Sequence, residues 1–208
     1  MPKSKTLFHG GLSIILHPDP HFSVGINDFG EGFYCSENLD AAKKRGWAKM
    51  AKENVDSYAV SEFYYKEDAS LKIKKFDNPD KEWLREIYYC RKYPCQYDVV
   101  IGPIADARIA IIMEDLEDEF RLIGNRLDGT KTVGEIKDEI FDRYAKRIAV
   151  GDISKMNQYV FVSKNAIQKC LSFKEGRIYN RENKEIDRIC SDGTHKHLKN
   201  NKNKGRDR

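Results

Sequence analysis

The sequence has no apolar run of 18 residues, so it contains no candidate transmembrane helix. Residues 1–5 lead into residues 6–9 rather than into the apolar segment of a secretory signal peptide. We therefore expect a cytoplasmic protein with no membrane partner. Secretion by a system that does not use an apolar signal peptide would not be visible in this sequence.

The cysteines are few and unpatterned. They form no Cys-x-x-Cys pair for a His-x3–5-His pair to match. An odd set of this kind argues against a zinc site and against a disulfide scaffold, and for reduced thiols. We therefore expect no metal. The five are Cys35, Cys90, Cys95, Cys170 and Cys190.

The body of the chain has no net charge. The formal charge of the 208 residues is +4, and residues 191–208 alone contain six Lys/Arg and two Asp/Glu, so residues 1–190 balance at zero. A neutral body is not typical of a protein that grips nucleic acid over its whole surface. From about residue 192 large apolar side chains almost vanish, which predicts disorder. RNA binding led by this basic tail stays open as an alternative.

Hydrophobic periodicity predicts an α+β fold. Residues 71–76 alternate with period two, and residues 97–106 hold the most apolar short run, which indicates a central strand buried on both faces. A short first strand at residues 6–8 is expected to break at Gly10. The other expected elements are helices at 39–51, 82–90 and within 107–150, and strands at 57–65 and 157–162.

Two glycines one residue apart precede two aromatic residues in the segment Gly30-Glu31-Gly32-Phe33-Tyr34. Glycines at these two positions have no Cβ, so the backbone can approach another group closely, and an aromatic ring is then held beside that group. A planar ligand would suit this arrangement. A loop that enters a strand, with Phe33 or Tyr34 in the core, is the structural alternative.

Three short stretches, in order, carry a resemblance to a known family. They are Phe8-His9-Gly10, the Gly30–Tyr34 segment and Asn157-Gln158-Tyr159, and together they resemble the His-Tyr-Glu arrangement of the diphtheria-toxin and poly(ADP-ribose) polymerase branch of ADP-ribosyltransferases. The closest likeness is to a small, largely bacterial family of ADP-ribosyltransferase-like domains catalogued without a function. Further shared residues are Asp28-Phe29, Trp83-Leu84, Tyr97-Asp98, Val100 to Pro103, Ala166, Leu171 and Phe173.

The resemblance covers residues 6–173 and implies an organisation of the whole chain. It implies one domain at 1–175 with split mixed and antiparallel β-sheets, peripheral helices and the helical segment 107–150 within it. Residues 176–208 would then form a polar, basic tail.

The resemblance also implies a substrate, NAD, and roles for individual residues. Tyr34 would stack on nicotinamide, the backbone of Gly10 would pair with the carboxamide, and Gly32 would line the same site. His9 would bond the adenosine ribose. Cleavage of the nicotinamide–ribose bond leaves an oxocarbenium-like sugar, and Gln158 stands where the family usually has the glutamate that stabilises this cation.

Two departures from the family pattern shape the expected activity. Gln158 can accept the hydrogen bond of the ribose 2′-hydroxyl but carries no charge, and charge-assisted bonds are about twice as strong as neutral ones. Ala42 replaces a serine that often touches the carboxamide, and Trp47 either supplies stacking instead or packs in the core. Polymer elongation is therefore not expected.

The resulting expectation is an NAD-dependent mono-ADP-ribosyltransferase of a toxin, effector or defence kind, with His9, Tyr34 and Gln158 as its catalytic set. The acceptor, protein or nucleic acid, is not named by any residue. A toxin would also call for an antitoxin or immunity partner. The alternatives are an NAD glycohydrolase and a catalytically weak NAD-binding or interaction module.

Overall fold

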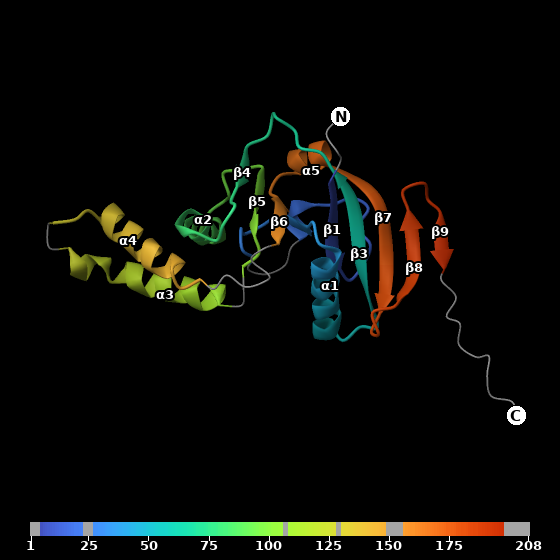
Figure 1. The fold of residues 1–208 in the computed structure, drawn as a ribbon, viewed down its shortest axis with the longest axis horizontal. Coiled ribbons are helices and arrows are strands. Elements are labelled where there is room, and N and C mark those ends of the chain that lie inside the picture. The colour runs from blue at the N-terminus through green and yellow to red at the C-terminus, as the bar shows by residue number, and fades with distance from the viewer. Residues whose placement is uncertain (1–4, 23–26, 106–107, 128–129, 149–155, 198–208) are drawn as a thin grey trace, which may run out of the picture. The chain divides into compact units, whose positions relative to one another are not determined.

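The structure is a computed structural model that describes residues 5–22, 27–105, 108–127, 130–148 and 156–197. The fold is α+β, as predicted, with nine strands and five α-helices in the described residues (Figure 1). Strand pairing is mixed, since β4 and β5 are parallel and the other recorded pairs are antiparallel. In the described part of the chain, no helix has the length and apolar character needed to cross a membrane.

The chain divides into two compact units. The first contains residues 1–19, 35–68 and 165–208, and the second contains residues 20–34 and 69–164. Strand β2 (Phe33–Ser36) crosses this division along the chain. Each unit has its own core.

The first unit is built on antiparallel strands. β1 (Lys5–Gly11) pairs with β3 (Ser57–Tyr65), β3 pairs with β7 (Leu171–Asn180), and β8 (Glu185–Cys190) and β9 (His195–His197) follow outward. Figure 1 shows α1 (Leu39–Glu53) lying along β1 and β3. α5 (Lys164–Cys170) leads directly into β7.

A small core joins α1 to the strands of the first unit. Ala42 and Met50 of α1 meet Tyr58 and Val60 of β3 and Tyr179 of β7. The helix begins at Leu39 because the Asn38 side chain accepts a hydrogen bond from the backbone N–H of Ala41 at 3.0 Å. Small residues on the inner face of the helix let it approach the sheet closely.

The second unit combines three strands with most of the helices. β5 (Val99–Pro103) lies between β4 (Ile73–Lys75), which is parallel to it, and β6 (Asn157–Phe161), which is antiparallel. All five residues of β5 are buried, so the prediction of a central strand is confirmed. α2 (Lys81–Lys92) covers these strands, and its Trp83 donates an indole hydrogen bond to the Pro103 carbonyl oxygen at 3.1 Å.

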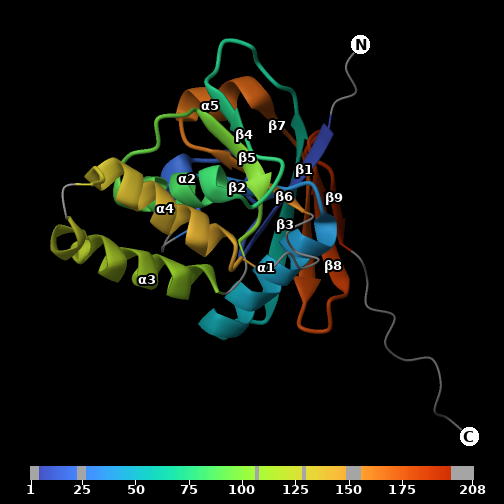
Figure 2. The same cartoon turned by 60° about the vertical axis from the view of Figure 1, so that its left-hand side comes forward.

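The helical segment predicted within residues 107–150 is present. It consists of α3 (Ile109–Arg121), the 3₁₀ turn η2 (Ile123–Arg126) and α4 (Val133–Ala145), and α3 and α4 lie side by side in both ribbon views (Figure 2). Tyr88 of α2, Phe120 of α3 and Phe141 of α4 meet edge to face, with ring centroids 5.1–5.7 Å apart. These contacts attach the helical segment to the rest of the second unit.

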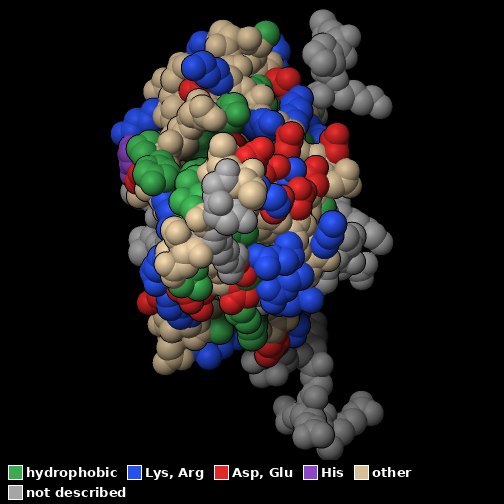
Figure 3. Space-filling view, turned by 90° about the vertical axis from the view of Figure 1, so that its left-hand side faces the viewer, with side chains coloured by type: hydrophobic (Ala, Val, Ile, Leu, Met, Phe, Trp, Pro, Cys, Tyr) green, Lys and Arg blue, Asp and Glu red, His purple; other side chains and the backbone are tan. Residues whose placement is uncertain are grey.

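The outer surface of α3 and α4 carries charges of both signs. Figure 3 shows Lys and Arg interspersed with Asp and Glu on the face viewed from that side. Ion pairs that link the helices include Lys92–Glu117 at 2.9 Å, Arg143–Glu119 at 2.9 Å and Arg147–Asp115 at 3.2 Å. This is the pattern of a solvated helical surface.

Two expected boundaries need correction. β1 continues through Gly10 and Gly11, so the glycines do not break it. Residues 176–197, expected to belong to a polar tail, include the end of β7 and all of β8 and β9. Ion pairs of Arg188 with Glu185 and with Glu175 support β8 and its pairing with β7. Of the tail predicted to be disordered from about residue 192, residues 198–208 lie outside the described residues.

Candidate functional site

Tyr34 is held by its own glycine-rich loop. Its hydroxyl accepts a hydrogen bond from the Phe29 backbone N–H at 3.0 Å and donates one to the Gly30 carbonyl oxygen at 2.8 Å. The ring is half-buried. A phenol fixed at its hydroxyl keeps a constant ring plane, which is what stacking on a flat ligand requires.

The two glycines of this loop are needed for close packing. Gly30 has φ +71°, and a Cβ there would lie 2.2 Å from the Cys90 carbonyl oxygen. A Cβ at Gly32 would lie 2.7 Å from Cγ1 of Val160 on β6. The loop therefore rests directly on α2 on one side and on β6 on the other.

Gln158 is a buried polar side chain on β6, opposite Gly102 of β5. Only 5% of it is exposed. Its amide nitrogen Nε2 donates to Asp28 Oδ2 at 2.7 Å and to the Pro103 carbonyl oxygen at 3.2 Å. Two acceptors at one end of the amide fix which atom is nitrogen. Among the described residues, no hydrogen bond reaches its carbonyl oxygen Oε1.

Asp28 anchors the loop to three other parts of the second unit. Besides Gln158, its Oδ2 accepts a hydrogen bond from the Ala105 backbone N–H at 3.1 Å. Its Oδ1 pairs with the Arg91 guanidinium at 3.4 Å, and the two side chains are 16% and 13% exposed. Arg91 also donates to the Asn27 carbonyl oxygen at 3.2 Å. The carboxylate is thus compensated by one cation and two further donors.

His9 and Gly10 lie on β1 in the first unit. In the register with β3, His9 stands opposite Ser61 and Gly10 opposite Val60. A Cβ at Gly10 would lie 1.9 Å from the Ala42 carbonyl oxygen of α1, so glycine is required there by the closeness of the helix. Trp47 of the same helix is 49% exposed, which excludes the core-packing alternative for this side chain.

The structure thus brings part of the predicted set together within one unit. In the second unit, Tyr34 and Gln158 both bind the loop at residues 27–30, and Gly32 packs on the strand that carries Gln158. His9 and Gly10 are neighbours in the first unit. Residue patterns did not single out Asp28 and Arg91 for the site, although Asp28 opens the shared segment around Gly30. Arg91 gave no signal, because its partner is 63 residues away.

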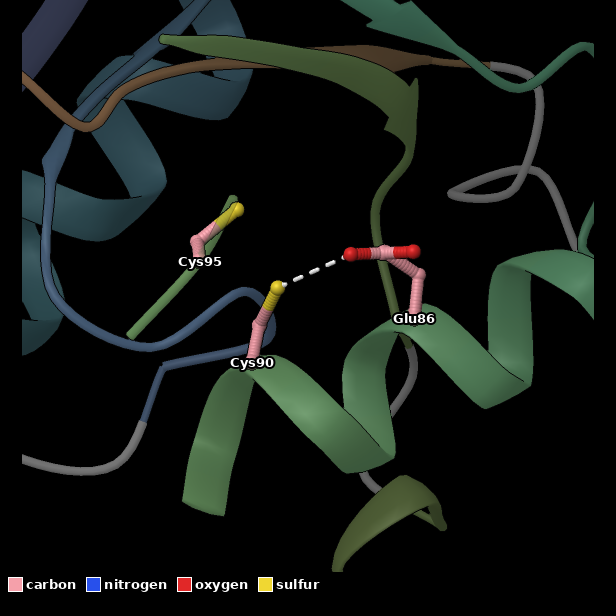
Figure 4. Close-up of side chains that lie close together, drawn as sticks. All are labelled: Glu86, Cys90 and Cys95. Carbon is pink, nitrogen blue, oxygen red and sulfur yellow. Dashed lines mark hydrogen bonds between the residues drawn. The ribbon is translucent and has the colours of Figure 1, made fainter. Parts of the chain in front are cut away.

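A second cluster lies at the carboxyl end of α2. Among the described residues, Glu86, Cys90 and Cys95 form one group in which all potential ligand atoms lie within 4.8 Å of one another. The Cys90 thiol donates to Glu86 Oε1 at 3.3 Å (Figure 4). The neighbouring Cys95 sulfur and burial raise the pKa of the Cys90 thiol, whereas its position beside Cys90 lowers the pKa of the Cys95 thiol.

The chain is thus an α+β protein in which the buried carboxamide of Gln158 is anchored to a loop rich in glycine and aromatic residues. Comparison with protein families gives a more particular assignment. Residues 5–173 match the family described as "Protein of unknown function (DUF3990)", and the chain belongs to this family. The comparisons with curated proteins and with solved structures found no match.

Proposed function

We propose that this protein is an NAD-dependent mono-ADP-ribosyltransferase, which breaks the nicotinamide–ribose bond and transfers ADP-ribose to a protein or nucleic-acid acceptor. The observation that carries the proposal is the state of Gln158. Its nitrogen is anchored by Asp28 and Pro103, and its carbonyl oxygen accepts no hydrogen bond from the described residues. A carbonyl oxygen without a donor, on a buried side chain, can accept a hydrogen bond from a ligand hydroxyl.

The chemistry requires an acceptor of this kind. Loss of nicotinamide leaves positive charge on the ribose ring, and an acceptor on the 2′-hydroxyl becomes more favourable as that charge develops. A neutral amide oxygen is weaker than a carboxylate in this role. The Asp28 carboxylate at 2.7 Å from Gln158 Nε2 polarises the amide, because chains of hydrogen bonds strengthen one another, and so makes Oε1 a better acceptor.

Tyr34 supplies the flat surface in this proposal. Its hydroxyl is tied to Phe29 and Gly30, so the ring stacks on nicotinamide without a further loss of side-chain freedom. Gly32 keeps the loop close to β6. Tyr34 and Gln158 then act on the two products of the same bond cleavage, the leaving group and the sugar.

His9 and Gly10 take the roles that the resemblance assigns to them. Gly10 offers backbone groups to the carboxamide, and His9 bonds the adenosine ribose. Both lie on β1 of the first unit, where the closeness of α1 fixes the backbone of Gly10. The resemblance alone supports these two assignments, and they are tested separately by His9→Ala, which should weaken NAD binding more than it slows bond cleavage at saturation.

The test is nicotinamide release from NAD by the purified protein. Wild type should release nicotinamide, and Tyr34→Ala and Gln158→Ala should each slow release by roughly a hundredfold, a typical effect of removing one transition-state contact. Tyr93→Ala is a matched control, because Tyr93 is 63% exposed and belongs to neither loop nor site. Equal rates in all four proteins would contradict the proposal.

A second experiment identifies the acceptor. NAD labelled in the adenosine half is incubated with the protein and a cell lysate, and label is then measured on protein, RNA and DNA. Transfer places label on one of these polymers only when Gln158 is intact. A toxin acting in this way would require an antitoxin or immunity partner, and co-purification from the native host would reveal it.

The lack of charge at Gln158 favours a second candidate, an NAD-binding module with little or no catalysis. It predicts that NAD raises the thermal midpoint while no nicotinamide appears. An NAD glycohydrolase, in contrast, releases nicotinamide and leaves all label as free ADP-ribose. The two assays together separate the three functions.

A further inference from the structure

The cluster at the carboxyl end of α2 has the composition of a metal site. It contains two thiols and one carboxylate, and none of the three takes part in the proposed NAD chemistry. Thiolates select soft or borderline cations, and Zn²⁺ is bound by Cys sulfur together with carboxylate oxygen. Calcium and magnesium, which prefer oxygen ligands, would not choose this set.

Local structure places the three ligands on one side of the helix end. Glu86 and Cys90 are four residues apart in α2, so their side chains lie one above the other on one helix face. Cys95 follows the helix by a few residues, and its side chain lies beside Cys90 (Figure 4). This spacing is not one of the usual zinc-binding motifs, so the sequence predicted no metal.

The distances suit a single small cation. Ligand atoms arranged tetrahedrally around Zn²⁺ at about 2.0–2.3 Å lie roughly 3.3–3.8 Å from one another. The Cys90 sulfur is 3.3 Å from Glu86 Oε1, and all three ligand atoms lie within 4.8 Å of one another. Small changes in side-chain torsion would bring all three to bonding distance.

The surroundings favour a cation and a thiolate. The cluster lies at the carboxyl end of α2, where the helix dipole is negative. Cys90 is buried, whereas Glu86 and Cys95 are half-buried. The site is therefore shielded from water on the Cys90 side and open to solvent on the other.

We propose that Glu86, Cys90 and Cys95 form a zinc-binding site, with water as the fourth ligand. The bound ion would replace the thiol–carboxylate hydrogen bond by three metal–ligand bonds and would release the thiol protons. It would also fix the end of α2, where the Cys90 carbonyl oxygen supports Gly30 and where Arg91 pairs with Asp28. The proposal concerns metal binding alone and does not depend on NAD chemistry.

The test uses the full chain, stripped of metal by a chelator and kept reduced. Wild type should take up one equivalent of Zn²⁺, and Co²⁺ at the same site should show a sulfur-to-cobalt charge-transfer band. Cys95→Ser and Glu86→Gln should bind Zn²⁺ at least about tenfold more weakly, and Cys95→Ser should lose most of the band. Cys190→Ser removes one half-buried thiol outside the cluster and should behave as wild type.

Thermal unfolding gives an independent readout. Zn²⁺ at a hundredfold excess over its dissociation constant should raise the midpoint of wild type and Cys190→Ser by roughly 5 °C or more, and that of Cys95→Ser much less. Failure of reduced wild type to bind Zn²⁺, or unchanged affinity in Cys95→Ser, would overturn the proposal. If Cys90 and Cys95 are found joined in a disulfide, the protein is reduced and tested again. Absence of zinc uptake after that reduction would also overturn the proposal.

Discussion

Gln158 and Asp28 are 130 residues apart in the chain, and the amide nitrogen of one lies 2.7 Å from a carboxylate oxygen of the other. This contact gives a physical reason for glutamine at position 158. A glutamate there would direct a second carboxylate at Asp28, in a place where the residue at 158 is 5% exposed. Asp28 and Gln158 therefore form one unit: the carboxylate orients the amide, and the amide satisfies the carboxylate.

Gln158→Glu should destabilise the protein by about 2–4 kcal/mol at neutral pH, because it loses a buried donor and adds a like charge. The two carboxylates would share a proton, so the pKa of the pair would be raised above that of the unfolded chain. A raised pKa stabilises the folded state below the unfolded pKa, and this contribution is lost as pH rises. The variant should therefore come closer to wild type near pH 4, measured by urea denaturation.

The matched double variant Asp28→Asn with Gln158→Glu restores an amide opposite a carboxylate. It should recover part of the lost stability at neutral pH, though not all, since a neutral asparagine at position 28 is a weaker partner for Arg91 than Asp28. A double variant as unstable as the sum of its single changes would show that the two side chains are not coupled.

Gly30→Ala should be damaging for two separate reasons. Its φ of +71° costs a side-chain-bearing residue about 1–2 kcal/mol, and its Cβ would lie 2.2 Å from the backbone oxygen of Cys90, which cannot move without shifting α2. We expect a loss of roughly 3 kcal/mol or more in the free energy of unfolding.

Two glycines provide controls for this prediction. Gly193 has φ +80° with open space around it, and Gly124 has open space and no such backbone conformation. Gly193→Ala should cost about 1–2 kcal/mol through its backbone alone, and Gly124→Ala should be close to neutral. Equal effects at Gly30 and Gly193 would mean that contact with Cys90 contributes nothing.

Local patterns predicted the elements of the fold better than their contacts. The strand at 57–65 and the helices at 39–51 and 82–90 depend on nearby residues, and all are present. The continuation of β1 through Gly10 was not predictable, because the reason for that glycine is the Ala42 carbonyl oxygen of α1. Turn propensity alone favours a break there.

The candidate site divides in the same way. Tyr34 and Gln158 were found by their order along the chain, whereas their partners are set by tertiary pairing. The contact of Asp28 with Gln158 depends on the register of β6 with β5, and the Glu86, Cys90 and Cys95 cluster depends on the path of the chain after α2. Neither produces a periodic or spaced motif. Strand β8 was missed because Arg188 pairs with Glu185 and with Glu175 there, a support that leaves no apolar pattern, and β9 was missed because its three residues, His195–His197, include no apolar side chain.

Glu62 should be the most sensitive charged residue of the first unit. Its side chain is 5% exposed and pairs with Lys174 and with Arg177, the latter at 2.8 Å. Glu62→Gln removes the buried carboxylate that pairs with both cations and leaves Arg177 with Glu175, so we expect a loss of about 3 kcal/mol, measured by urea denaturation. Glu182→Gln removes an exposed partner of Lys184 and should cost less than about 0.5 kcal/mol. Similar losses in both variants would contradict the burial argument.

The capping box of α4 predicts a pH dependence of known sign. The Thr132 backbone N–H and hydroxyl donate to the Glu135 carboxylate at 2.8 Å, and these bonds lower the pKa of Glu135. A lowered pKa stabilises the folded state above the unfolded pKa, and this contribution is lost as pH falls through the folded value.

Glu135→Gln keeps the shape and the acceptor of the box but removes its charge. The variant should therefore be less stable than wild type at pH 7, and the difference should shrink as pH falls from the unfolded pKa of glutamate, about 4.3, through the lower folded pKa of Glu135. Thr132→Ala, which removes the cap itself, should cost about 1 kcal/mol with a weaker dependence on pH. A difference between wild type and Glu135→Gln that stays constant from pH 7 to pH 3 would show that the carboxylate charge does not stabilise the start of α4.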